Sequence, residues 1–171
     1  LHFMLKRYEK AAASWDRYAT LVETDIASGG LLITCYTALG DRANVERVAQ
    51  RTMARAEKAV ATDADNGSAM ATIFSCLLCL GEAERAKEWA RRAVLIDPDN
   101  LGMRYNLACD FVVAVHDHDM ALEMLRPVCR NSGHEQIAWI AADPDMDPLR
   151  DDPRFKELVA EAEARLATAQ P

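Results

Sequence analysis

Two cysteines three residues apart, Cys76 and Cys79, have the spacing of half a zinc site or of a redox pair. They lie in an apolar run that predicts a helix, and no second Cys pair or nearby His pair completes a set of four ligands. We therefore expect these thiols to lie in the core or to line a groove. The chain has five cysteines, all within apolar helical patterns, which is typical of reduced thiols in a cytosolic protein.

Two further clusters combine side chains that could bind a metal ion. The turn at residues 116–119 has the sequence His-Asp-His-Asp, and residues 143–147 have the pattern Asp-x-Asp-x-Asp that begins a calcium loop. Alternate side chains of a loop diverge, and the calcium pattern then needs glycine and glutamate where this chain has Pro148 and Arg154. We expect the acidic residues to cap helices, and we expect no metal and no cofactor.

The sequence carries none of the motifs that bind nucleotide phosphates or position a catalytic serine, so we expect no enzyme activity in this chain. A net charge of −7 argues against nucleic acid as a partner, because phosphate binding needs a basic surface. No apolar stretch reaches the ~18 residues that a membrane span needs. We expect a cytoplasmic protein, and the start at Leu1, within a predicted helix, suggests a piece of a longer one.

The elements that position these residues follow an internal repeat. Residues 67–100 and 101–134 form two copies of one unit, and the acidic breakers at 63–66 and 97–100 lie 34 residues apart. A period in the thirties, with small residues at helical spacing, is typical of stacked helical hairpins. Alanine and leucine dominate the composition while glycine and proline are scarce. The chain is therefore predicted to be all-α.

Apolar spacing by threes and fours, together with turn glycines, defines the predicted helices. The distance from Gly40 to Ala59 exceeds that from Gly81 to Ala93 by seven residues, which predicts one helix that is two turns too long. Pro127 predicts a kink or an early end. Trp15 and Trp139 are expected to pack between helices. The predicted helices are 3–24, 26–39, 43–62, 68–80, 82–96, 101–115, 119–130 and 153–168.

This pattern resembles the tetratricopeptide repeat family, whose unit is a pair of antiparallel helices of 34 residues in total. The likeness covers roughly residues 8–130, with one residue inserted around His116. It implies an α-α superhelix, a right-handed solenoid of antiparallel hairpins with a C-terminal capping helix. The matching residues are Gly81, Ala86, Ala90, Ala93 and Pro98 in one repeat, Leu107, Ala108, Phe111, Ala121 and Leu125 in the next, and Leu32, Tyr36, Gly40 and Ala59 in an elongated earlier one.

The resemblance implies a division into three parts. Residues 1–25 would be a truncated leading repeat helix, and residues 132–171 an Asp-Pro-rich segment with the capping helix. Between them lie three hairpins, at 26–66, 67–100 and 101–131.

A second likeness concerns the stretch from Tyr36 to Asp41, the stretch 54–59, and the Asp-Pro-rich stretch 147–155. These are similar to repeat regions that follow bacterial class III adenylate cyclase domains and related signalling domains. This likeness implies the docking or regulatory part of a larger bacterial signalling protein.

In this family, ligands lie along the concave face formed by the first helix of each hairpin. The residues carried over to that face are small and apolar, which favours a protein or peptide segment with an apolar face as partner. Two alternatives stay open: a terminal helix of the chain fills the groove, or the chain is a dimerisation or spacer domain linking catalytic domains. The groove residues are Thr34, Thr37, Ala38, Ser75, Leu78, Cys79, Tyr105, Asn106, Cys109, Val112 and Val113.

Overall fold

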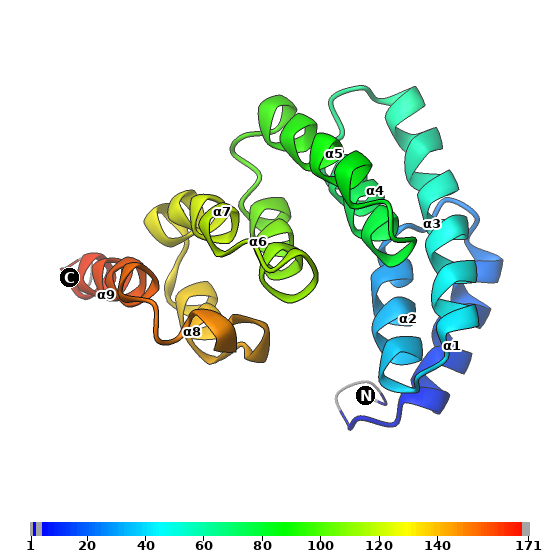
Figure 1. Cartoon of the computed structure of the whole chain (residues 1–171), viewed down its shortest axis with the longest axis horizontal. Helices are drawn as coiled ribbons and strands as arrows, with labels where there is room; N and C mark the ends of the chain where they lie inside the picture. Colours follow the sequence, from blue (N-terminus) through cyan, green and yellow to red (C-terminus); the bar gives the residue numbers. More distant parts are fainter. Residues whose placement is uncertain (1, 3–4, 169–171) are drawn as a thin grey trace. The chain divides into compact units, whose positions relative to one another are not determined.

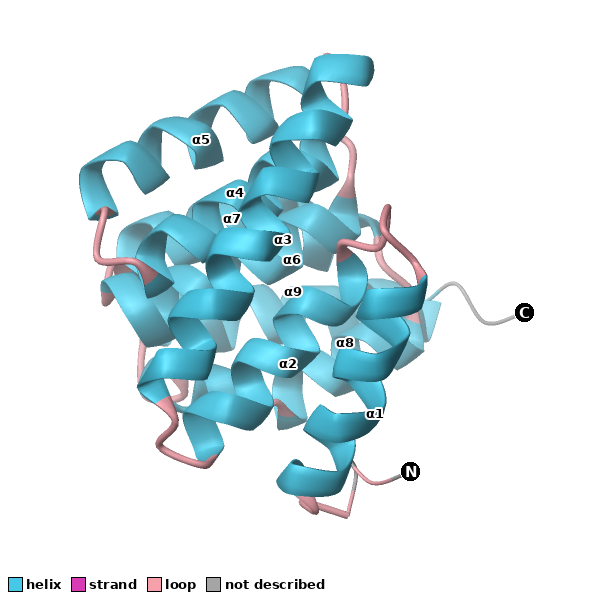
Figure 2. Cartoon of the chain, turned by 90° about the vertical axis from the view of Figure 1, so that its right-hand side faces the viewer, coloured by secondary structure: helices cyan, strands magenta, loops and turns pink. Residues whose placement is uncertain are grey.

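The computed structural model describes residue 2 and residues 5–168, and Figure 1 shows them as helices joined by short loops. Within these residues there is no strand, as Figure 2 also shows, so the all-α prediction is confirmed. In the same residues, no helix combines the length and apolar character needed to cross a membrane. The chain divides into two compact units, Leu1–Ile96 and Asp97–Pro171, and each is described by itself.

The first unit is a run of helices in which each packs against the next along the chain. The predicted helix 3–24 includes residues 3 and 4, which lie outside the described residues. The observed helix begins at Tyr8. The other predicted helices agree with the observed ones to within one residue at either end. The helices are α1 (Tyr8–Leu21), α2 (Ala27–Ala38), α3 (Arg42–Thr62), α4 (Gly67–Cys79) and α5 (Ala83–Ile96).

Two glycines form the tight turns between paired helices. Gly40 follows α2 and Gly81 follows α4, with φ angles of 69° and 79° that other residues adopt only with strain. The helices after these turns differ in length, because α3 has 21 residues and α5 has 14. The difference of seven confirms the predicted helix with two additional turns.

Small side chains lie where the helices of this unit cross. Ala86, Ala90 and Ala93 are buried along one side of α5. The tightest approach is between α2 and α3, where a Cβ atom built on Gly29 would lie 2.3 Å from the Thr52 Oγ1 atom. Ala83, the first residue of α5, is exposed.

One carboxylate links three helices of the first unit. Asp16 of α1 accepts hydrogen bonds from the Tyr36 hydroxyl of α2 at 2.6 Å, and from Arg47 and Arg51 of α3 at 2.9 Å each. Burial raises the pKa of Asp16, but the hydrogen bonds from these three residues outweigh it and lower the pKa below its usual value. Trp15, the neighbouring residue, packs against the core as predicted.

The second unit contains two elements that the sequence analysis missed, a short helix at 134–142 and a 3-10 turn at 144–149. The predicted final helix is present, and Phe155, Leu158 and Leu166 are buried on its inner side. It packs against both α7 and α8. The elements are α6 (Leu101–Asp110), the π-helical turn η1 (Phe111–Val115), α7 (His118–Asn131), α8 (His134–Ala142), the 3-10 turn η2 (Pro144–Leu149) and α9 (Pro153–Thr168).

The first residues of the two repeated units follow the same kind of helix cap. Asn66 caps α4 and Asn100 caps α6, 34 residues later, and each side chain accepts a hydrogen bond of 2.9 Å from the backbone N–H three residues on. A π-helical turn, η1, lies between α6 and His116, and such a turn holds more residues than an α-helical turn. After this turn, His116 takes a left-handed conformation with φ of 58°.

A kink or an early end was expected at Pro127, and the early end is wrong, because helix α7 continues to Asn131. Leu125, Val128 and Cys129 around the proline are buried. Trp139 does not pack between helices, since 54% of its surface is exposed.

The approach of α2 to α3 predicts opposite effects at two adjacent glycines. Gly29→Ala forces a methyl group into Thr52, and overpacking of this kind costs about 1–3 kcal/mol in the free energy of unfolding. Gly30→Ala is the matched control, because nothing lies within 4 Å of the new Cβ, and it should stabilise the helix by about 0.5–1 kcal/mol. Chemical denaturation of both variants measures the difference, and equal stabilities would contradict the packing described.

The environment of Asp16 predicts an acid-sensitive contribution to stability. Its pKa is lower in the folded than in the unfolded chain, so its contribution is complete above the unfolded value of about 3.9 and is lost as pH falls further. The free energy of unfolding of wild type should therefore exceed that of Asp16→Asn by a constant amount at about pH 5–7, and the excess should shrink below about pH 3.9. An excess that does not change on acidification would show that the carboxylate is not stabilised in this way.

Candidate functional site

The predicted groove residues fall into two sets, one in each unit. In the first unit, Thr34, Thr37 and Ala38 are exposed on α2, whereas the α4 residues are partly buried. In the second unit, Asn106 and Val113 are exposed. Val112 is completely buried, so its side chain belongs to the core and is not available to a partner. The partly buried groove residues are Ser75, Leu78 and Cys79 in the first unit and Tyr105 and Cys109 in the second.

Within the second unit, Tyr105 connects a buried acid to an exposed aromatic ring. Its hydroxyl group donates a hydrogen bond to the carboxylate of Asp143 and accepts one of 2.7 Å from the Trp139 indole N–H. Asp143 is only 7% exposed and Trp139 is 54% exposed. These three side chains come from α6, from the N-cap of η2 and from α8, so the hydrogen bonds fix the orientation of a surface indole relative to α6 and to the start of η2.

The backbone around Asp143 is held by Arg150. The guanidinium group donates to the carbonyl oxygens of Ala141 and Asp143, the second at 3.0 Å, and its Nε donates to the Asp147 carboxylate at 2.6 Å. The Asp143 side chain also accepts a bond of 3.0 Å from the Asp145 backbone N–H, and so caps η2. Arg150 therefore fixes the junction of α8 and η2 without pairing with the Asp143 carboxylate.

Cys109 lies one helical turn after Tyr105 and faces the same acidic turn. The Cys109 sulfur and one carboxylate oxygen each from Asp143 and Asp145 all lie within 4.8 Å of one another. Burial raises the pKa of the Cys109 thiol to about 12, although the Tyr105 hydroxyl acts in the opposite direction. The thiol is protonated at neutral pH, and a protonated thiol is a poor nucleophile.

The pKa values of the neighbouring groups are also raised. Burial raises the pKa of Tyr105, and the hydrogen bond to Asp143 adds to this effect. Partial burial raises the pKa of Asp145, and the charge of Asp143 raises it further. The raised pKa values favour the protonated forms of Tyr105 and Asp145.

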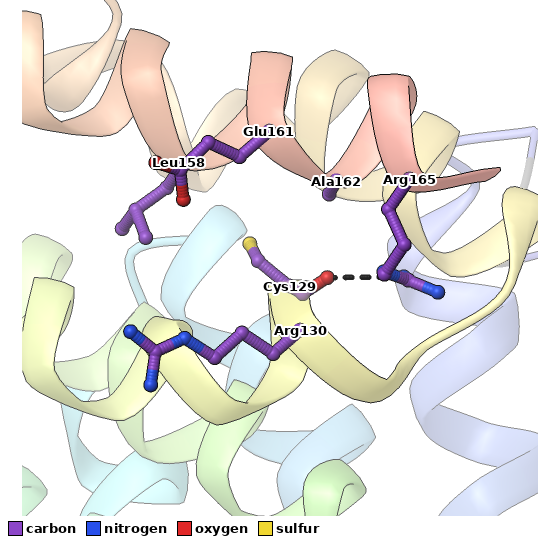
Figure 3. Close-up of a pocket in the computed structure, with 6 residues that line it drawn as sticks. All are labelled: Cys129, Arg130, Leu158, Glu161, Ala162 and Arg165. Carbon is purple, nitrogen blue, oxygen red and sulfur yellow. Dashed lines mark hydrogen bonds between the residues drawn. The ribbon is translucent and has the colours of Figure 1, made fainter. Parts of the chain in front are cut away.

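A separate small pocket lies between α7 and α9 and is shown in Figure 3. Leu158 and Ala162 lie on its α9 side, opposite Cys129 of α7. Arg165 donates hydrogen bonds to the carbonyl oxygens of Cys129 at 3.1 Å and of Ser132 at 2.6 Å, at the end of α7. The guanidinium group thus secures α9 to α7, which gives this place a structural role.

The His-Asp-His-Asp turn acts as a cap, as predicted. The Asp117 side chain accepts a hydrogen bond of 3.1 Å from the Met120 N–H at the start of α7. The Asp119 carboxylate forms an ion pair of 2.7 Å with Arg154 of α9. The other predicted constellation, the Cys76 and Cys79 pair, has Cys76 in the core and Cys79 partly buried, in agreement with the packing role expected of it.

No protein-family model matches the chain, and no curated protein matches it either. Its function therefore has to be inferred from its own side chains. Sequence reasoning included Tyr105 and Cys109 among the groove residues but missed Trp139 and the link through Asp143. The acidic residues of the 143–147 stretch were predicted to be caps, but the hydrogen bond between Tyr105 and Asp143 joins residues 38 positions apart, which no local motif marks.

The hydroxyl group of Tyr105 is predicted to stabilise the second unit. Tyr105→Phe removes the hydroxyl group that donates to the buried Asp143 carboxylate and accepts from the Trp139 N–H, which should lower the free energy of unfolding by about 1–3 kcal/mol. Tyr18→Phe is the control, because Tyr18 is exposed and contacts Trp15 through its ring. Denaturation should leave the control within about 0.5 kcal/mol of wild type, and an equally small effect at Tyr105 would contradict the network.

Proposed function

We propose that this chain is a non-catalytic protein-interaction scaffold whose helix pairs form a superhelix similar to tetratricopeptide repeats. Support comes from the 34-residue spacing of the capped helix starts at Asn66 and Asn100 and from the glycine turns at Gly40 and Gly81. Scaffolds of this kind present helix faces to other proteins. The proposed setting is a cytoplasmic docking or regulatory region of a larger bacterial signalling protein.

The observation that carries the proposal is the fixed, exposed indole of Trp139. Tryptophan and tyrosine are the residues that contribute most often to binding energy at protein interfaces. Because Tyr105 and Asp143 already hold the ring, a partner does not have to immobilise it, and preorganisation of this kind increases affinity. Val113, in the π-helical turn η1 that follows α6, is 51% exposed and adds apolar surface to this unit. The partner proposed is a protein segment with an apolar face.

The test is affinity capture from a lysate of the native host with the full chain as bait. Trp139→Ala should reduce recovery of the partner at least tenfold, since truncating an interface tryptophan costs about 2 kcal/mol or more. Trp89→Ala is the matched control, because Trp89 lies in the first unit and stacks with Arg92, and it should retain the partner. Equal recovery by wild type and Trp139→Ala would overturn the assignment of this surface.

Light scattering after size exclusion distinguishes docking from dimerisation. The docking proposal expects a monomer for wild type. A stable dimer that Trp139→Ala or Val113→Asp converts to monomer would replace docking with the dimerisation or spacer role. Val113 suits this measurement better than Val112, whose buried side chain would report on folding.

A further inference from the structure

The second unit brings together three metal-binding groups that are far apart in the sequence. Cys109 comes from α6, whereas Asp143 and Asp145 come from the beginning of η2, more than thirty residues later. Their sulfur and carboxylate oxygen atoms lie within 4.8 Å of one another, so small side-chain rotations would bring all three to the distances that one shared zinc ion requires. The arrangement depends on the contact between η1 and η2, which sets the end of α6 beside the acidic turn.

The types of donor indicate which ion would fit. Thiolate sulfur is a ligand for zinc and other borderline or soft ions, whereas calcium and magnesium prefer oxygen alone. One sulfur and two carboxylates give three protein ligands, and a water molecule can complete a tetrahedral zinc site. The donor set is therefore unlike the calcium-loop pattern of residues 143–147, since it includes a thiol from another helix.

The charges at this place also favour a cation. The carboxylates of Asp143 and Asp145 lie close together, and within the described part of the chain neither forms an ion pair. Arg150, the nearest basic residue in sequence, uses its guanidinium group on two carbonyl oxygens and on Asp147. Among the described residues, the hydrogen bonds to the Asp143 carboxylate come from neutral donors, the Tyr105 hydroxyl and the Asp145 backbone N–H. A buried carboxylate beside a second one is costly without a compensating positive charge.

We propose that Cys109, Asp143 and Asp145 form a zinc-binding site. On binding, the Cys109 thiol loses its proton to solvent and the sulfur bonds to the ion, while the two carboxylates supply oxygen ligands. The bound ion would fasten α6 to η2 beside Tyr105, and so stabilise the part of the unit that holds Trp139. This site goes beyond the proposed scaffold function and does not depend on it.

The experiment uses the full chain, reduced and stripped of metal, and titrates it with zinc by calorimetry. Cobalt is the second probe, because a cobalt–thiolate bond gives a charge-transfer absorption that carboxylate ligands alone do not. The variants are Cys109→Ser and Asp145→Asn. Cys79→Ser is the matched control, since it removes another partly buried thiol on a helix of the first unit.

We expect one zinc ion per chain, at least about tenfold weaker binding in both site variants, and unchanged binding in Cys79→Ser. The cobalt–thiolate absorption should be present in wild type and absent in Cys109→Ser. Zinc should also raise the melting temperature of wild type but not of Asp145→Asn. Because Asp145 is exposed, this substitution should leave the fold of the metal-free chain unchanged.

Three results would overturn the site: no zinc binding by wild type, zinc binding that both site variants retain at full strength, or a cobalt–thiolate signal that disappears in Cys79→Ser instead. The affinity-capture test of the scaffold proposal does not depend on zinc. Either proposal can therefore fail in its own experiment while the other succeeds.

Discussion

The close approach of helix backbones at small residues is the constraint on which the packing of the first unit depends. Where α2 crosses α3, Gly29 leaves no room for even a methyl group beside Thr52. Along α5, Ala86, Ala90 and Ala93 are buried and keep the distance to α4 short. Hairpins that pack this closely must turn within a few residues, which is why Gly40 and Gly81 take left-handed conformations.

The second unit depends on a polar constraint as well. Asp143 is buried at the start of η2, and its carboxylate reaches α6 through Tyr105 and the surface through Trp139. A buried carboxylate must be satisfied wherever it lies, so the elements that supply its partners are held in fixed positions. The same acid faces Cys109, so one residue supports both the aromatic surface of the proposed scaffold and the proposed zinc site.

The sequence predicted most of the helices because their signals are local. Turn glycines, capping residues and the seven additional residues of α3 act within one or two turns, and each appeared where expected. The predicted set of groove residues did not include Trp139 for the opposite reason. Trp139 has no periodic pattern around it that marks it as exposed, and the meeting of Tyr105 with Asp143 joins residues 38 positions apart. Val112 looked like a groove residue because the π turn that changes the direction of the side chains after Asp110 leaves no sequence motif.

The central claim, that backbone proximity at small residues holds the hairpins together, is tested most directly by a double-mutant cycle on Gly29 and Thr52. The free energy of unfolding is measured for wild type, Gly29→Ala, Thr52→Gly and the double variant. If the two residues are in contact, Thr52→Gly removes the obstacle, and the cost of Gly29→Ala should fall by at least about 1 kcal/mol in that background. An unchanged cost of Gly29→Ala in both backgrounds would show that the helices do not meet there.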